Sequence, residues 1–163
     1  MSTFTRRIRS GLLVLILTGV TVLVAGPQGM ASPAGAQPTG PVGSLASYEG
    51  NRVKEAGDPK VWLVLCGQRA NIPNERIYEG LFRDWEGIVT MSDVDSIGQG
   101  AGLNGAFLAK GPSAHVYLVR PEGGRKHYIA SESAFNRWHF DWDKIITTDQ
   151  SYLDRLSNGC ILG

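Results

Sequence analysis

The chain has 163 residues, of which 16 are basic and 15 acidic, so its formal net charge is +1. Lysine and arginine form no run in the part that we expect to fold, which excludes nucleic acids and anionic membranes as evident partners. That part, about 115 residues long, is large enough for one domain with a modest core.

Residues 1–36 are predicted to be an export signal peptide. Three arginines precede an uncharged apolar run at 11–25, and the small residues at 34–36 resemble a cleavage site. The run is too short to span a bilayer comfortably, which favours a cleaved signal over an anchor. Arg6 and Arg7 leave a twin-arginine route open beside general secretion. Cleavage leaves 13 basic against 15 acidic residues, a net charge of −2, and we expect the protein to be secreted and extracellular.

Residues 37–49 are rich in proline, glycine and small side chains, and we expect a disordered tail. A tail that is followed at once by strand residues is suited to insertion into a partner or to strand addition. Tyr48 and Val53, at this junction, are therefore predicted partner-binding residues.

From residue 50 onward the sequence contains two copies of one pattern. Val-Trp-Leu-Val at 61–64 returns as Val-Tyr-Leu-Val at 116–119, and the Asp-Trp pair at 84–85 returns at 141–142. A repeat of this length indicates one supersecondary unit in two copies, each burying its apolar face against the other. Within a two-repeat domain at 50–163, we place repeat 1 at 50–104, repeat 2 at 105–158 and a closing strand at 159–163. Asn-Gly-Ala-Phe-Leu at 104–108 is echoed by Asn-Gly-Cys-Ile-Leu at 158–162, so we expect the closing strand to be the first strand of a third unit.

Each copy is expected to contain a strand, a central strand with a hairpin to a third strand, a short helix and an extended pair. The central strand is apolar on both faces, so both faces should be covered. Asn74 and Ser131 are predicted helix N-caps. The predicted fold class is α+β: two tandem strand-rich repeats with small antiparallel sheets, closed by a C-terminal strand and a disulfide. The expected strands are 51–55, 61–65, 68–72, 106–110, 116–120 and 125–129.

Two further features of the repeat lead to predictions. Trp85 and Trp142 each follow an aspartate and precede an apolar pair, so we expect equivalent core residues. The aspartates before them are expected to cap the chain locally rather than bind a cation. The glycine-rich segment 98–102 lacks the context of a phosphate-binding loop and is expected to be a flexible connector.

The order of these motifs resembles a tandem repeat of about 55 residues, of the type VYLV…KRxIP…F…DWxxI, in secreted actinobacterial proteins. The resemblance covers residues 50–162. Repeat 1 keeps the Ile72-Pro73 pair of that pattern, whereas repeat 2 has Ala130 where the pattern has proline. The resemblance implies exported modules that occur alone or beside cell-wall and surface domains, and it implies no catalytic residue.

Cys66 and Cys160 are the only cysteines, and an even count in an exported protein predicts a disulfide. The bond would tie the end of the central strand of repeat 1 to the C-terminal strand. Two free thiols are the alternative.

No pattern typical of an active site is found. The histidines His115, His127 and His139 occur only in repeat 2, with no compact metal-ligand spacing. No nucleophile elbow, zinc-protease motif or carboxylate pair is legible. We therefore expect a non-enzymatic protein without a cofactor or a bound metal.

Two classes of function follow. The preferred one is a secreted protein–protein adaptor, such as a connector subunit of an extracellular multi-subunit toxin-type assembly, with other secreted proteins as partners. The alternative is a cell-wall or carbohydrate-binding module, in which aromatic rings stack on sugars and two copies give avidity. Exposure of Trp85 or Trp142 would favour that alternative, and a secreted hydrolase inhibitor is a weaker third. Besides Tyr48 and Val53, the predicted binding residues are Trp62, Tyr117, Tyr128 and Trp138.

Overall fold

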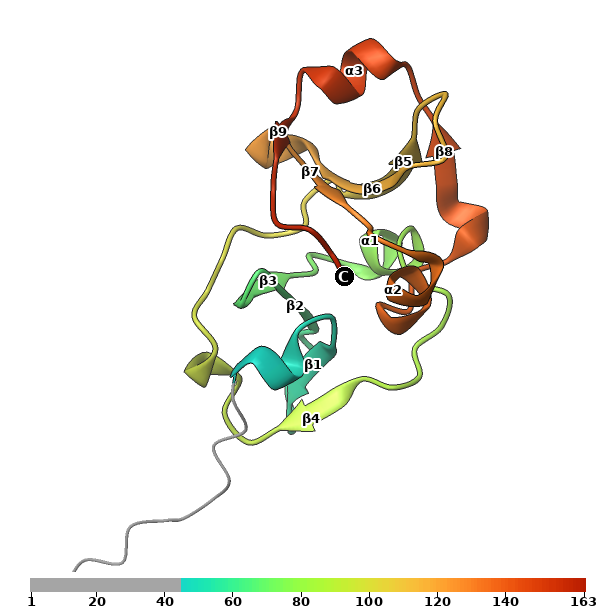
Figure 1. The fold of residues 1–163 in the computed structure, drawn as a ribbon. Helices are drawn as coiled ribbons and strands as arrows, with labels where there is room; N and C mark the ends of the chain where they lie inside the picture. Colours follow the sequence, from blue (N-terminus) through green and yellow to red (C-terminus); the bar gives the residue numbers. More distant parts are fainter. Residues whose placement is uncertain (1–44) are drawn as a thin grey trace, which may run out of the picture. The chain divides into compact units, whose positions relative to one another are not determined.

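The computed structural model describes residues 45–163, which contain two mixed sheets and several short helices (Figure 1). The predicted signal peptide and residues 37–44 of the predicted tail lie outside the described residues. The last part of that tail, Leu45–Tyr48, forms a 3-10 turn, η1. Among residues 45–163, no helix is both long enough and apolar enough to cross a membrane.

Repeat 1 forms a four-stranded sheet in the order β3-β2-β1-β4. The first three strands are antiparallel neighbours, and β4 runs parallel to β1 with Val53 opposite Val89. The elements are β1 (Arg52–Glu55), β2 (Trp62–Leu65), β3 (Gln68–Asn71), α1 (Glu75–Glu79), β4 (Val89–Met91) and the 3-10 turn η2 (Val94–Ser96).

Repeat 2 forms a five-stranded sheet in the order β8-β5-β6-β7-β9. Its first four strands match those of repeat 1 in order and direction, and β9 adds a parallel neighbour to β7. The elements are β5 (Phe107–Lys110), β6 (Val116–Arg120), η3 (Pro121–Gly123), β7 (Arg125–Tyr128), α2 (Glu132–Arg137), η4 (Trp142–Lys144), β8 (Ile145–Thr147), α3 (Gln150–Asp154) and β9 (Ser157–Asn158).

The prediction of antiparallel sheets is wrong for the edge strands β4 and β8. The hairpins within each sheet are antiparallel, as short turns require. Each edge strand instead follows a helical excursion, and a chain that returns through a helix can lie parallel to the strand it meets. The helix starts are as predicted: the Asn74 carboxamide accepts the Ile77 N–H at 3.0 Å, and the Ser131 hydroxyl accepts the Ala134 N–H at 3.0 Å.

The C-terminal segment does not begin a third unit. Leu162 N–H donates to Tyr128 O at 2.8 Å, and in repeat 1 Leu103 N–H donates to Asn71 O at the same distance. The last residues of repeat 2 therefore copy the segment 99–103, which ends repeat 1, and not the strand after it. The local likeness of Asn-Gly at 104–105 and 158–159 gave the wrong register.

The glycine-rich segment is paired rather than free, so its prediction as a flexible connector is also wrong. Gln99 bridges Arg69 in parallel, Arg69 N–H donates to Gly98 O at 2.9 Å, and Gly100 N–H donates to Arg69 O at 2.9 Å. Glycine at position 100 lets this segment lie close against β3, because a Cβ atom there would come within 2.8 Å of the Gln68 side chain. Each repeat thus ends by pairing along its own third strand.

The two repeats share one hydrophobic core, which lies between their sheets and includes the apolar side chains of the short helices α1 and α2. Phe82 and Phe140 form a bridge across the junction, flanked by Asp141 N–H to Leu81 O at 3.0 Å. Trp138 is buried against Gly50, where a Cβ would come within 3.1 Å of the indole. Smaller apolar clusters cover the outer faces of the two sheets, which confirms that the central strands are covered on both sides.

Each hairpin tip is bonded to the opposite repeat, and we call these two connections clasps. Cys66, at the tip between β2 and β3, forms the predicted disulfide with Cys160, and their Cα atoms are 5.9 Å apart. At the corresponding place in repeat 2, the Arg120 guanidinium donates to the carbonyl oxygens of Ala101 and Gly102. One junction is covalent, and its counterpart consists of hydrogen bonds.

Candidate functional site

Trp85 and Trp142 lie at the surface, and the prediction that they are core residues is wrong. Their exposed fractions are 48% and 45%. The Trp85 indole stacks on Tyr78 with ring centroids 3.7 Å apart, and Trp142 stacks on Phe135 at 3.9 Å. One face of each indole is therefore supported by a buried ring while about half of the side chain faces solvent. The expectation that their two environments match is confirmed.

Each of these tryptophans forms a wall of a pocket. Site 1 has a volume of about 290 Å³ and is lined by residues 59–61 and 71–75 with Tyr78 and Trp85. Site 2 has a volume of about 310 Å³ and is lined by 114–116 and 128–132 with Phe135 and Trp142. The ten lining residues of one site correspond one for one to those of the other, at spacings of 55 or 57 residues. The repeat therefore reproduces a complete surface pocket as well as a fold.

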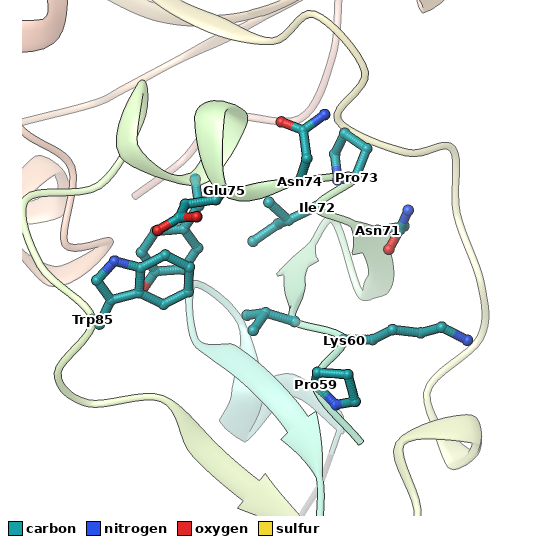
Figure 2. A pocket seen from close by; sticks show the side chains of 10 residues that line it. Pro59, Lys60, Asn71, Ile72, Pro73, Asn74, Glu75 and Trp85 are labelled. Atoms are coloured by element: carbon teal, nitrogen blue, oxygen red, sulfur yellow. The ribbon is translucent and has the colours of Figure 1, made fainter. Parts of the chain in front are cut away.

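The rim of site 1 is polar. Figure 2 shows Trp85 on one side of the pocket and Asn71 on the other, with the Lys60 side chain extending away from the indole. Glu75 and Asn74, at the start of α1, complete the edge nearest the helix. The site thus combines a flat apolar wall with carboxylate, amide and ammonium groups that can bind hydroxyls.

Site 1 owes its shape to a buried arginine. Arg52, only 1% exposed, donates to the Tyr78 hydroxyl and to the carbonyl oxygens of Asp84 and Glu86. These bonds hold the loop that carries Trp85 above the Tyr78 ring. Burial raises the pKa of Tyr78, so its hydroxyl keeps the proton that it donates to Asp84 O at 2.9 Å.

Site 2 is held without a buried cation. The position that corresponds to Arg52 is Phe107, and the Trp142 indole N–H instead donates to the Asn136 side-chain oxygen at 3.0 Å. On its rim, His115 packs edge-on against Tyr128 with ring centroids 5.1 Å apart. Site 2 is therefore the more aromatic of the two pockets, since the corresponding residues of site 1 are lysine and asparagine.

The aspartates before the two tryptophans cap the chain, as predicted. The Asp84 carboxylate accepts the Glu86 N–H at 3.0 Å, and the Asp141 carboxylate accepts the Asp143 N–H at 3.0 Å. Each bond closes the turn that presents the indole between them.

Two of the predicted partner-binding residues are inaccessible. Val53 is fully buried under η2, and Trp138 is 1% exposed in the shared core. Val53 is predicted from its place after the tail and Trp138 from its aromatic ring, but apolar and aromatic side chains are also the ones that a core buries. They cannot touch a partner while the domain is folded.

The other predicted residues are half-buried, and only one of them belongs to a site. Tyr48 and Trp62 pack on the cluster beneath η2, and Tyr117 packs on the cluster beneath α3. Tyr128 lines site 2. The sites themselves were missed, although comparing the copies at a spacing of 57 residues reveals the shared Glu75/Glu132 and Trp85/Trp142.

Within residues 45–163, one group of potential metal ligands is close enough to meet: Cys66, His127 and Cys160. Its two sulfur atoms are joined to each other in the disulfide, so neither is a thiolate ligand. Comparisons of the chain with protein-family models, with curated proteins and with solved structures find no match.

Proposed function

We propose that this protein is a secreted, non-enzymatic carbohydrate-binding module with two equivalent sites. The observation that carries the proposal is the repeated pocket in which a half-exposed tryptophan lies on a buried ring. A large aromatic side chain left half in water at matched positions of both copies stabilises the fold less than a buried one would. Its retention in both copies is accounted for by a ligand that stacks on it.

The chemistry of the pockets suits sugars. The apolar face of a pyranose ring packs on an indole, and its hydroxyls donate to carboxylates and accept from amide or phenol groups around the rim. Site 1 provides Asn71 and Glu75 for this purpose, and site 2 provides Tyr128 and Glu132. Volumes near 300 Å³ lie at the small end of ligand pockets, which suits one or two sugar units of a longer chain.

Two sites in one chain give the proposal a second element, avidity. Weak sites that engage one polymer together can bind about 10² to 10⁴ times more tightly than either site alone. A cell-wall polysaccharide presents many copies of its repeating unit, so we propose it as the target. The predicted membership of the secreted tandem-repeat family, whose modules also occur beside cell-wall domains, agrees with a target in the cell wall.

The adaptor role is the alternative proposal. It is favoured by exposed apolar side chains outside the two sites, Ile146 at 50% and Ile161 at 68% exposure. It is weakened by the burial of Val53, one of the two tail-junction residues predicted to bind a partner, whereas the burial of Trp138 removes a residue predicted to stack on sugars.

Retention on insoluble polysaccharides tests the proposal. Oxidised protein is incubated with peptidoglycan, chitin or cellulose, and the bound fraction is measured for Trp85→Ala, Trp142→Ala and the double variant. We expect each single substitution to weaken retention by about tenfold or more and the double variant to lose it. Near-UV and far-UV circular dichroism checks that each variant is folded.

The matched control is Ile146→Ala, which removes an equally exposed apolar side chain outside both pockets. It should be retained like the wild type. If no polysaccharide retains the protein while a secreted protein co-purifies in stoichiometric amount with wild type and double variant alike, the adaptor role replaces the carbohydrate proposal.

A further inference from the structure

A third cavity, of about 280 Å³, lies between the two hairpins beside the disulfide. Both repeats line it with corresponding residues: Leu65 and Arg120, Gln68 and Arg125, Ala70 and His127, Ala101 and Cys160. Repeat 1 contributes neutral side chains at these places. Repeat 2 contributes two arginines and a histidine, so the cavity is basic on one side only.

The two arginines face each other directly. Arg120 on β6 is paired with Arg125 on β7, whereas the corresponding pair in repeat 1 is Leu65 and Gln68. Like charges at directly opposed positions of a sheet repel each other. The pKa of Arg120 is lowered, first by burial and then by the charge of Arg125. Both causes make the charged form of this guanidinium less favourable.

Neither arginine is neutralised by an acidic side chain in the described part of the chain. The three ion pairs there involve Arg52, Arg69 and Arg83. No aspartate or glutamate lines the cavity, and the buried Nε of Arg120 has no hydrogen-bond partner among residues 45–163. The Nη2 atom of Arg120 donates to the carbonyl oxygens of Ala101 and Gly102, so Nε is the donor of this guanidinium that lacks, within the described residues, the acceptor buried donors normally have.

His127 adds a third basic group to the same wall. Its ring is 1% exposed, and Nδ1 lies 3.2 Å from Cys160 O, a distance at which Nδ1–H donates to that carbonyl. Nε2 is buried and has no partner within residues 45–163. Burial lowers the pKa of His127, so with Nδ1–H donating to Cys160 the Nε2 atom of the neutral ring is an acceptor, and the donors on this wall that suit an anion are the two arginines.

We propose that this cavity binds a tetrahedral oxyanion: inorganic phosphate or sulfate, or a phosphate group carried on a polymer. Guanidinium groups bind such anions with charge-assisted, often bidentate hydrogen bonds. The bound anion accepts from Arg120 and Arg125, which lie opposite each other on the two strands of the β6–β7 hairpin, beside the disulfide. This site is separate from the two tryptophan pockets, so it does not depend on their function.

Titration of the oxidised protein with sodium phosphate tests the proposal, with sodium chloride at equal ionic strength as the reference. Calorimetry should show one site, and the unfolding temperature should rise with phosphate but not with chloride. Arg125→Gln removes one exposed arginine and should weaken phosphate binding by at least about tenfold. Arg76→Gln is the matched control, because it removes an exposed arginine that does not line this cavity.

Two further probes identify the source of the anion. Glycerol phosphate is a monoester, and dimethyl phosphate carries the diester found in phosphate-linked polymers. Binding of inorganic phosphate alone supports a free anion, and binding of the esters as well supports a phosphate on a polymer. The proposal is overturned if phosphate and chloride act alike, or if Arg76→Gln weakens binding as much as Arg125→Gln does.

Discussion

Repeat 1 and repeat 2 build the same surface pocket with different interior residues. In repeat 1 a buried arginine, Arg52, fastens the loop of Trp85 through three hydrogen bonds. In repeat 2 the corresponding residue is Phe107, and Trp142 is held by Asn136. What the two copies keep in common is the exposed indole on its buried ring. The exposed tryptophan is the same in both repeats, while the residues that hold it in place differ. A repeat kept only for folding would instead be expected to keep its interior residues and vary its surface.

The repeats also differ in charge around their hairpin tips. Repeat 2 carries all three histidines and the opposed pair Arg120 and Arg125, whereas repeat 1 has Leu65 and Gln68 at the corresponding positions. Because the two tips lie on one cavity, their difference gives that cavity a basic side and a neutral side. Divergence between the copies has therefore produced a third environment that neither copy contains alone.

The largest expected effect concerns the two clasps between the repeats. Cys66→Ser with Cys160→Ser removes the covalent clasp, whose loop of 94 residues restricts the unfolded chain. We expect the free energy of unfolding to fall by about 4 to 5 kcal/mol, as the loop entropy predicts. Arg120→Gln, which weakens the hydrogen-bonded clasp, should lower it by only about 1 to 2 kcal/mol. Urea unfolding measures both, and equal losses would show that the clasps are equivalent.

The buried arginine gives the next largest effect. Arg52→Met leaves the Tyr78 hydroxyl and the Glu86 carbonyl without their donor and removes one of the two donors to the Asp84 carbonyl, and it should lower the free energy of unfolding by about 3 kcal/mol. The corresponding change in repeat 2, Phe107→Leu, should lower it by about 1 kcal/mol. Chemical unfolding compares the two. A smaller loss for Arg52→Met than for Phe107→Leu would contradict the role assigned to the guanidinium.

The smallest effect is a dependence on pH that repeat 2 alone contributes. Burial is the main cause that lowers the pKa of His127, and the charges of Arg120 and Arg125 lower it further. The unfolded chain therefore binds a proton at a higher pH than the folded one, so stability is full above about pH 6.5 and falls as the pH drops below it.

Urea midpoints at pH 7.5 and at pH 5, in buffers free of phosphate and sulfate, should show this fall for the wild type. His127→Gln should reduce the fall, whereas His115→Gln, at an exposed position, should leave it unchanged. His139, whose pKa is also lowered mainly by burial, should account for part of what remains. An unaltered pH dependence in His127→Gln would assign the effect elsewhere.

The elements of the fold could be predicted from the sequence because each depends on local signals. Strand alternation, the caps Asn74 and Ser131 and the repeat spacing located the strands and helices within a residue or two. The partners of the edge strands could not be predicted, since an apolar pair such as Ile88-Val89 does not indicate the direction of its neighbour. The closing segment was misplaced because a short likeness at 158–159 outweighed the pairing with β7, which no local pattern records.

The candidate sites were missed for a different reason. Aromatic residues in a small domain are usually buried, so the sequence predicts Trp85 and Trp142 to be core residues, and it offers Trp138 as a binding residue. The structure exposes the first two side chains and buries the third. The helix carries Trp138 inward against Gly50, and the capped turn after it carries Trp142 outward. A repeat predicts that the two matching residues have the same environment, but not whether that environment is exposed to solvent or buried.

The disulfide has a mechanical consequence for the proposed binding of a polymer. Both tryptophans lie between Cys66 and Cys160 along the chain, inside the covalent loop. Tension applied between the segment before Cys66 and the residues after Cys160 passes through the sulfur–sulfur bond and bypasses the 93 residues between them. The segments that carry both tryptophans, and all of site 2, are thereby shielded from stretching along the backbone, whereas residues 59–61 of site 1 lie before the loop and are not.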